Sequence, residues 1–137
     1  MLVGDIDLAA SSHDAFHALW HEHRALPERY DVAQGKLHAG AWAEAYPLRP
    51  ELAESAYALY QATGAHVYLE RGAEMIASLN AVARSGAAFA TVRSVRTRQL
   101  DDHMPSFFLA ETLKYLCARP DPRVNLTLAR TKALKST

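Results

Sequence analysis

A run of apolar residues from position 49 to about position 62 constrains the fold of this 137-residue chain more than any other feature. Pro50 stands in its first turn and Gly64 follows its last, and these residue types favour the start and the end of a helix. Its apolar members leave almost no polar flank: Leu52, Ala53, Ala56, Tyr57, Leu59 and Tyr60. A helix that is apolar on nearly all sides is buried on most of them, so we expect other helices to surround this one.

Charged side chains cluster where this predicted helix begins. Arg49 precedes Pro50, and Glu51 and Glu54 follow in the first turn. The spacing of three residues places both carboxylates on one helix face, beside backbone N–H groups that favour an anion. Such a pair can share a water, an ion or a sugar hydroxyl and so form the floor of a polar pocket. The local pattern taken alone favours a solvated first turn with a capping carboxylate.

Apolar periodicity predicts three further helices. The first covers about residues 6–24, with an expected inward stripe of Leu8, Ala15, Phe16 and Leu19. The next covers about residues 66–84, with Leu69, Gly72, Ile76, Leu79 and Ala83 inward and Arg71, Glu74 and Ser78 outward. The last covers about residues 105–118, with a packing stripe of Phe108, Leu109, Thr112 and Leu116. We expect the helices at 49–62 and 66–84 to form an antiparallel hairpin.

Two connecting stretches are predicted to be irregular. Residues 25–45 contain Pro27, Gly35 and Gly40 among residues of mixed polarity, which indicates a long loop. Loops of this length in a compact domain are usually functional or disordered. Residues 87–98 lose the helical period and favour a short strand pair or an extended loop.

Composition excludes several classes of function. The 15 basic and 15 acidic side chains cancel, so we expect no binding surface for nucleic acid or an anionic membrane. Cys117 is the only cysteine, which excludes an internal disulfide and a cysteine-based zinc site. No apolar run approaches the roughly 20 residues of a membrane span, and the first residues lack the pattern of a signal peptide.

Three histidines recur every fourth residue along the first predicted helix: His13, His17 and His21. A ladder of this kind could hold a transition metal. No carboxylate or cysteine completes a catalytic set, and a half-exposed polar stripe explains the pattern equally well. We therefore favour the polar stripe.

Blocks of sequence carry a resemblance to a known family. The first is YPLRPELAES at residues 46–55, followed by YALYQATG at residues 57–64, and the second is SFFLAETLKYL at residues 106–116. Both resemble the class I α-mannosidases of glycoside hydrolase family 47. The block LPERY at residues 26–30 resembles one branch of that family, the ER degradation-enhancing α-mannosidase-like proteins.

The resemblance implies an all-α fold of antiparallel helical hairpins that forms a section of a seven-hairpin (α/α) barrel. It implies a partial catalytic domain over residues 1–118 and a divergent, frayed tail over residues 119–137. With hairpins missing, we expect exposed apolar faces on the helices at 49–62 and 66–84, and self-association through them.

The implied function is inverting hydrolysis of terminal α-1,2-linked mannose from N-glycans, or recognition of such glycans in ER glycoprotein quality control. By motif match, Glu51 is an active-site carboxylate, Arg49 is a sugar contact, and Glu54 orders water around a bound calcium ion. Loop residues of the family reach toward the glycan, and the candidates here are Glu28, Arg29, Tyr30 and Trp42. The implied partners are high-mannose N-glycans on glycoproteins, and the implied location is the endoplasmic reticulum or secretory pathway.

The chain also departs from the family pattern. The threonine that holds calcium and the other active-site acids lie in segments that this chain lacks. Pro105 stands where the family has glutamate, and a first-turn proline should be replaceable by glutamate with little structural cost. We therefore expect the chain alone to be inactive. A non-catalytic glycan-binding protein and a helical-repeat interaction module remain as alternatives.

Overall fold

The computed structural model describes residues 5–40 and 42–118, and most of these residues are helical. The long helices are α1 (Ile6–His23), α2 (Glu51–Thr63) and α3 (Val67–Val82). A π-helix, η1 (Phe108–Leu113), continues into the short helix α4 (Lys114–Cys117). Two antiparallel hairpins complete the fold, β1 (Tyr30–Asp31) with β2 (Lys36–Leu37) and β3 (Arg84–Ser85) with β4 (Ala88–Phe89).

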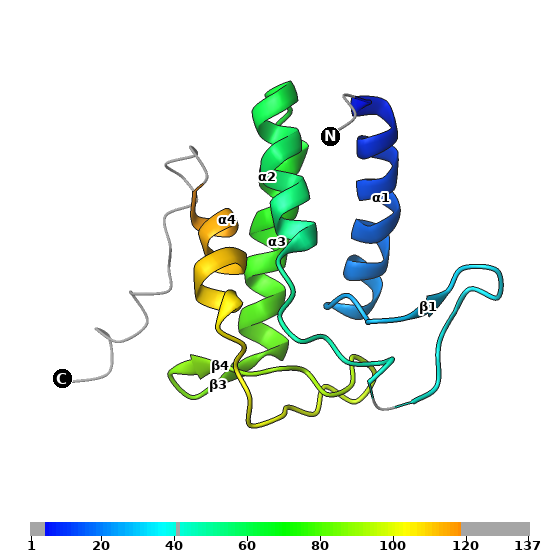
Figure 1. Cartoon of the computed structure of the whole chain (residues 1–137), viewed down its shortest axis with the longest axis vertical. Coiled ribbons are helices and arrows are strands. Elements are labelled where there is room, and N and C mark those ends of the chain that lie inside the picture. Colours follow the sequence, from blue (N-terminus) through cyan, green and yellow to red (C-terminus); the bar gives the residue numbers. More distant parts are fainter. Residues whose placement is uncertain (1–4, 41, 119–137) are drawn as a thin grey trace.

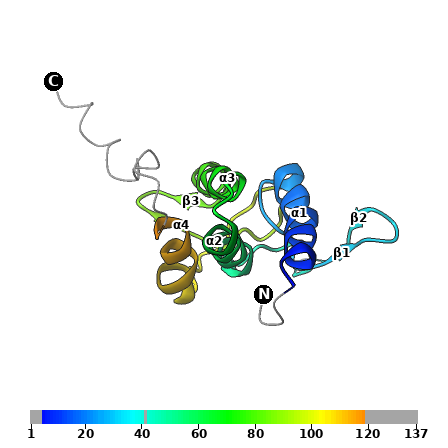
Figure 2. The same ribbon diagram turned by 90° about the horizontal axis from the view of Figure 1, so that it is seen from above.

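Helix α2 is the centre of the molecule. It packs against α1, α3, η1 and α4, and the view along the helices shows it between α1 and α4 (Figure 2). Its buried side chains are Leu52, Ala53, Ala56 and Leu59. Gly64 ends the helix in the left-handed conformation with φ of 67°, which glycine adopts without a steric penalty. The predicted central helix and its stop signal are both confirmed.

Helix α1 does not bury the predicted stripe. Asp5 caps its start by accepting a hydrogen bond from the N–H of Leu8 at 2.9 Å, but the Leu8 side chain is 59% exposed. Phe16 is 52% exposed, whereas His13 and Trp20 are buried. The prediction was wrong because two faces of α1 are apolar or aromatic, and periodicity alone does not tell which one meets the core.

Polar side chains join α1 to α3 along one seam. Glu74 contacts Nδ1 of His21 at 2.6 Å and Nε2 of His17 at 3.3 Å, and Arg71 pairs with Asp14 at 2.6 Å. Glu74 and Arg71 therefore face α1 instead of open solvent. Ser78, also predicted to point outward, is buried at 1% exposure.

The histidine ladder belongs to this seam. His13 is 2% exposed, with its ring stacked on His17 at 6.1 Å and edge-on to Tyr68 at 5.6 Å. Burial, with smaller contributions from Arg71 and His17, lowers the pKa of His13 to about 4. Within residues 5–40 and 42–118, no three His, Cys, Asp or Glu side chains are grouped so as to hold a metal ion. The exposure of the three histidine rings thus increases along the ladder, from a buried ring to an exposed one.

The last helix begins later than predicted and contains a π turn. Pro105 lies before it and is buried, and its carbonyl accepts the Phe108 N–H at 3.0 Å. Phe108, Thr112 and Leu116 point into the core, but Leu109 is 58% exposed and is not part of the packing stripe. A π-helix turns less per residue than an α-helix. Phe108, Thr112 and Leu116, spaced by four, therefore stay on one face, while Leu109 points outward.

The hairpins lie near one end of the long helices (Figure 1). The predicted loop at residues 25–45 contains β1 and β2. Of the second strand pair only β4 falls within the predicted irregular stretch 87–98, because α3 ends at Val82 and β3 starts at Arg84, where a helix was still expected. Among the described residues no helix is long and apolar enough to cross a membrane.

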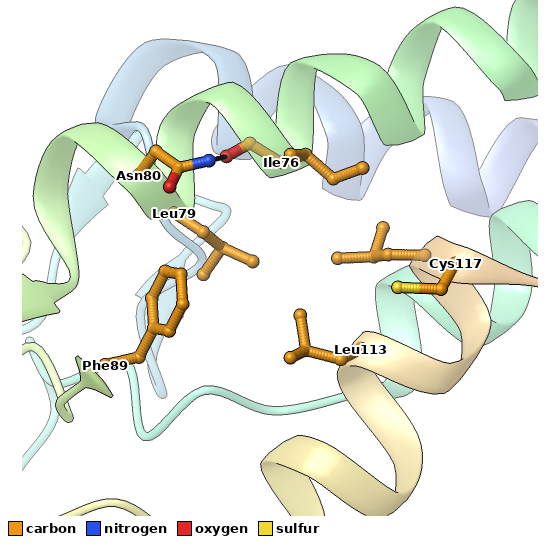
Figure 3. Close-up of a pocket in the computed structure, with 7 residues that line it drawn as sticks. Ile76, Leu79, Asn80, Phe89, Leu113 and Cys117 are labelled. Atoms are coloured by element: carbon orange, nitrogen blue, oxygen red, sulfur yellow. Dashed lines mark hydrogen bonds between the residues drawn. The ribbon is translucent and has the colours of Figure 1, made fainter. Parts of the chain in front are cut away.

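An apolar seam between α3 and η1 with α4 contains a gap of about 10 Å³ (Figure 3). Its lining is apolar apart from Asn80, whose side-chain amide donates to the Ile76 carbonyl at 3.0 Å, and Cys117. A gap of this size has room for about one water at most. This seam is a packing contact and not a ligand site.

Candidate functional site

A strained backbone turn at Leu48 comes directly before the start of α2. Leu48 has φ of 61°, a left-handed value that bulky side chains rarely adopt, and its side chain is fully buried at 0% exposure. A residue in this region costs about 1–3 kcal/mol and persists only where the surroundings enforce it. The turn therefore fixes the direction in which Arg49, Pro50 and Glu51 leave the core.

Contacts from distant segments enforce this turn. The hydroxyl of Thr112, in η1, donates to the Leu48 carbonyl at 2.7 Å, and the hydroxyl of Tyr46 donates to the Arg49 carbonyl at 3.1 Å. The backbone of Tyr46 pairs in both directions with Val92, at 2.8 and 3.0 Å. The Tyr46 ring packs edge-on against Trp20 of α1 at 5.2 Å. Thr112 thus contacts the turn itself, and Val92 and Trp20 hold the neighbouring Tyr46.

The side chain of Arg49 is held by the loop before the turn. Its Nε and Nη2 donate to the two carboxylate oxygens of Glu28 at 2.5 and 2.8 Å, a bidentate pair. This hydrogen bond is the main reason that the pKa of Arg49 lies above its usual value. The Glu28 N–H donates to the Ala45 carbonyl at 2.9 Å, which ties the loop to the segment entering the turn. The Arg49 side chain is therefore held in one orientation, and 47% of it remains exposed.

An exposed aromatic side chain lies in the same loop. Trp42 is 58% exposed, and the guanidinium of Arg29 lies 4.4 Å from the centre of its ring. Tyr30 is turned toward α1, with its ring 6.2 Å from that of His23. Of the two loop aromatics, Trp42 therefore offers more open ring surface for stacking.

Glu51 and Glu54 both line a cleft of about 860 Å³ between α1 and α2. Glu51 is exposed, and Oε1 of Glu54 accepts a hydrogen bond from the Tyr115 hydroxyl at 3.2 Å. The same-face expectation for the two acids is confirmed by this shared lining. Sequence reasoning did not identify Tyr115 and Thr112 as neighbours of the site, because no local spacing links them to α2.

A calcium ion would find few ligands here. Calcium takes six to eight oxygen ligands, and within the described residues Glu54 and Glu51 are not joined by a third acidic or histidine side chain in a metal-holding group. These residues do not make a calcium site by themselves.

The fold and the site together define a helical protein with an oriented arginine and a carboxylate at the N-terminus of its central helix. The model of glycosyl hydrolase family 47 matches residues 2–126, so the chain belongs to this family.

Individual relatives support this family assignment. "Alpha-mannosidase I MNS5" of Arabidopsis thaliana is 51% identical over 116 residues, which are 85% of this chain and 20% of the relative. "ER degradation-enhancing alpha-mannosidase-like protein 2" of Homo sapiens is 43% identical over 121 residues, 88% of this chain and 21% of the relative. The chain therefore spans about one fifth of the length of these curated relatives.

A solved structure supports the fold. The alpha-1,2-mannosidase from Trichoderma reesei superposes with a TM-score of 0.51 and 34% sequence identity, over 54% of this chain and 16% of that one. The helical arrangement of part of this chain is thus found in a mannosidase structure.

Proposed function

We propose that residues 1–118 form part of the catalytic domain of an α-1,2-mannosidase that acts on N-glycans, with residues 119–137 as a divergent tail. In this proposal the helices are a section of a seven-hairpin (α/α) barrel. Glu51 is one active-site carboxylate, Arg49 contacts the sugar, and Glu54 orders water near calcium bound with ligands from elsewhere. The names of the relatives support a role in ER glycoprotein quality control, and hence a location in the endoplasmic reticulum or secretory pathway.

The observation that carries this proposal is the enforced turn before α2. Leu48 stores backbone strain, and strain of this kind is maintained where a site needs a fixed geometry. The contacts from Tyr46 and Thr112 hold the turn rigid, while Arg49 and Glu51 remain exposed.

The chain alone provides only half of the required chemistry. Inverting hydrolysis needs an acid and a base on opposite faces of the sugar, roughly 6.5–9.5 Å apart. Glu51 and Glu54 share one helix face, so both would approach a sugar from the same side. We infer that the chain binds mannosides and that turnover requires acids from the rest of a longer protein.

The binding test uses α-1,2-linked mannobiose and isothermal titration calorimetry. We expect weak binding that Arg49→Ala and Glu51→Gln each reduce by roughly tenfold, as expected for loss of a charge-assisted hydrogen bond. Glu70→Gln is the matched control, since Glu70 is an exposed glutamate in the first turn of α3. Equal affinity in the wild type and in Glu51→Gln would refute the role of Glu51.

A non-catalytic glycan-binding role is the second candidate. Pro105 is buried where the family resemblance expects a glutamate, so an apolar ring occupies the position of one acid. Mannobiose binding with no turnover in a full-length protein carrying this segment would favour this role. No mannoside binding at all would favour a helical-repeat interaction module instead.

A further inference from the structure

Glu28 lies on a short segment after α1, and this segment is held at several points. Arg24 ends α1 in the left-handed conformation with φ of 63°. Ala25 and Pro27, which follow it, are buried. The N–H of Glu28 then donates to the Ala45 carbonyl at 2.9 Å. A side chain that stands on backbone fixed in this way can hold another side chain in a defined position.

The carboxylate of Glu28 faces Arg49 and is largely shielded from solvent. Only 16% of the Glu28 side chain is exposed, against 47% of Arg49. Both carboxylate oxygens accept hydrogen bonds from Arg49, one from Nε and one from Nη2. A guanidinium has five N–H donors, so both N–H groups of Nη1 and one of Nη2 remain for a ligand. Glu28 therefore has little surface for a sugar and can act on one through Arg49.

The same pair decides the charge that a ligand meets. The charges of Glu28 and Arg49 sum to zero, and the exposed Glu51, which acts on Arg49 electrostatically, leaves an excess of one negative charge. An arginine without a carboxylate partner is a preferred binding group for phosphate. With Glu28 in place, these three residues favour an uncharged hydroxyl over an anionic group.

We propose that Glu28 is a positioning and specificity-determining residue of the sugar site. Its carboxylate directs the guanidinium of Arg49 toward a mannose hydroxyl and cancels its charge, so that neutral mannosides bind in preference to phosphorylated ones. Glu28 itself does not touch the sugar. This inference rests on the proposed sugar contact of Arg49.

The test compares α-1,2-linked mannobiose with the same disaccharide phosphorylated at O6 of its terminal mannose. Affinities for the full chain are measured by NMR titration. In Glu28→Gln we expect the affinity for mannobiose to fall roughly threefold, because a neutral acceptor holds the guanidinium less firmly. The affinity for the phosphorylated sugar should rise roughly tenfold, because the charge of Arg49 is no longer cancelled. Glu28→Asp keeps the carboxylate and should keep the preference for the neutral sugar.

Glu44→Gln is the matched control. Glu44 lies in the same predicted loop, its side chain is 17% exposed, and it pairs with a different arginine, Arg96, at 3.3 Å. We expect both affinities to stay within about twofold of the wild type, since a distant ion pair of this exposure has little effect on a separate site.

Two further measurements do not depend on how well Glu28→Gln folds. In the wild type, added salt should not weaken the binding of the phosphorylated sugar, because the local charge repels it. A marked loss of its affinity with salt would show an uncompensated arginine and overturn the proposal. The Nε–H signal of Arg49 should exchange slowly with water in the wild type, and fast exchange would show that Glu28 does not hold it.

The outcomes separate this inference from the proposed function. Equal losses of both affinities in Glu28→Gln would indicate a merely structural role, and no change in either would indicate none, so each result would overturn the inference alone. Mannobiose binding that is absent, or unaffected by Arg49→Ala, would overturn the sugar contact of Arg49 and this inference with it. Opposite changes in the two affinities in Glu28→Gln, with little change in Glu44→Gln, would support the assignment.

Discussion

At the scale of single residues, the Leu48 carbonyl links the turn before α2 to η1. It belongs to a buried residue with positive φ, and its partner is the hydroxyl of Thr112, which is itself 1% exposed. A buried hydrogen bond of this kind leaves an unsatisfied carbonyl when its donor is removed. The stability of the turn and the placement of Glu51 therefore depend in part on the Thr112 hydroxyl.

We predict that Thr112→Val lowers the free energy of unfolding by about 1–3 kcal/mol, because the shape is kept while the donor is lost. Urea denaturation followed by circular dichroism measures the change. Thr112→Ser keeps the hydroxyl, so it should keep most of this contribution and lose only the packing of one methyl group. Wild-type stability of the valine variant would show that the hydrogen bond does not hold the turn.

At the scale of elements, the seam between α1 and α3 makes stability depend on pH. His13 is buried on α1 among Tyr68 and Arg71 of α3 and His17 and Asp14 of its own helix. Burial lowers the pKa of His17 as well, despite the opposing effect of Glu74. Protonating these rings places positive charge next to Arg71 in a region shielded from water.

We predict that the chain loses stability as the pH falls from about 6.5 toward 4. The pKa of His13 is about 4 when folded and 6.5 ordinarily, so in this window the unfolded chain binds a proton that the folded chain does not. The loss reaches about 3 kcal/mol at most. Urea midpoints for His13→Phe should vary less between pH 7 and 5 than those of the wild type.

The control for this pH series is His38→Asn, because His38 is exposed in the loop after β2. It should retain the pH dependence of the wild type. If His13→Phe and the wild type lost stability in parallel, the dependence would arise elsewhere in the molecule.

The turn into η1 gives a second prediction at this scale. Pro105 is buried and precedes the helix, and this burial argues against the expectation that a glutamate would be tolerated there. We predict that Pro105→Glu destabilises the chain by about 2 kcal/mol or more, because a buried carboxylate lacks a partner. Pro105→Ala should cost less, since it loses packing but buries no charge. Thermal unfolding of both variants tests this order, and equal stability of the two would contradict it.

At the scale of the whole molecule, the described residues form a cluster of helices around α2, with a cleft of about 860 Å³ between α1 and α2. The apolar surface expected on the helices at 49–62 and 66–84 is instead most evident on α1, because α2 is covered by α1, α3, η1 and α4. Part of this exposed apolar surface, at Leu8 and Phe16, lines the cleft that also contains Glu51 and Glu54.

We predict that the chain releases no mannose from an oligomannose N-glycan, with or without added calcium. Loss of one member of an acid–base pair lowers the rate by about 10²–10⁴, and this chain carries only one candidate member. Chromatography of labelled glycans after long incubation is the measurement. Calcium-dependent release that Glu51→Gln abolishes would show that the chain holds a complete site.

The sequence by itself determined the central helix and the position of two acidic residues in its first turn. The apolar run, Gly64 at its end and the spacing of Glu51 and Glu54 are local signals, and local hydrogen bonding and periodicity act on them in any context. The family blocks likewise predicted the mannosidase-like helical hairpins. These features required no knowledge of which segments meet.

Only the tertiary structure decided how the site is held and which surfaces stay open. Leu48 and Thr112 are 64 positions apart, and no local sequence pattern predicts their hydrogen bond or the positive φ of Leu48 that it supports. The choice between the two faces of α1 depends in the same way on distant residues, because Tyr68 of α3 packs against His13 and Tyr46 packs against Trp20. Contacts between distant segments select one of several locally acceptable arrangements, because burial is a property of the assembled chain and not of any one segment.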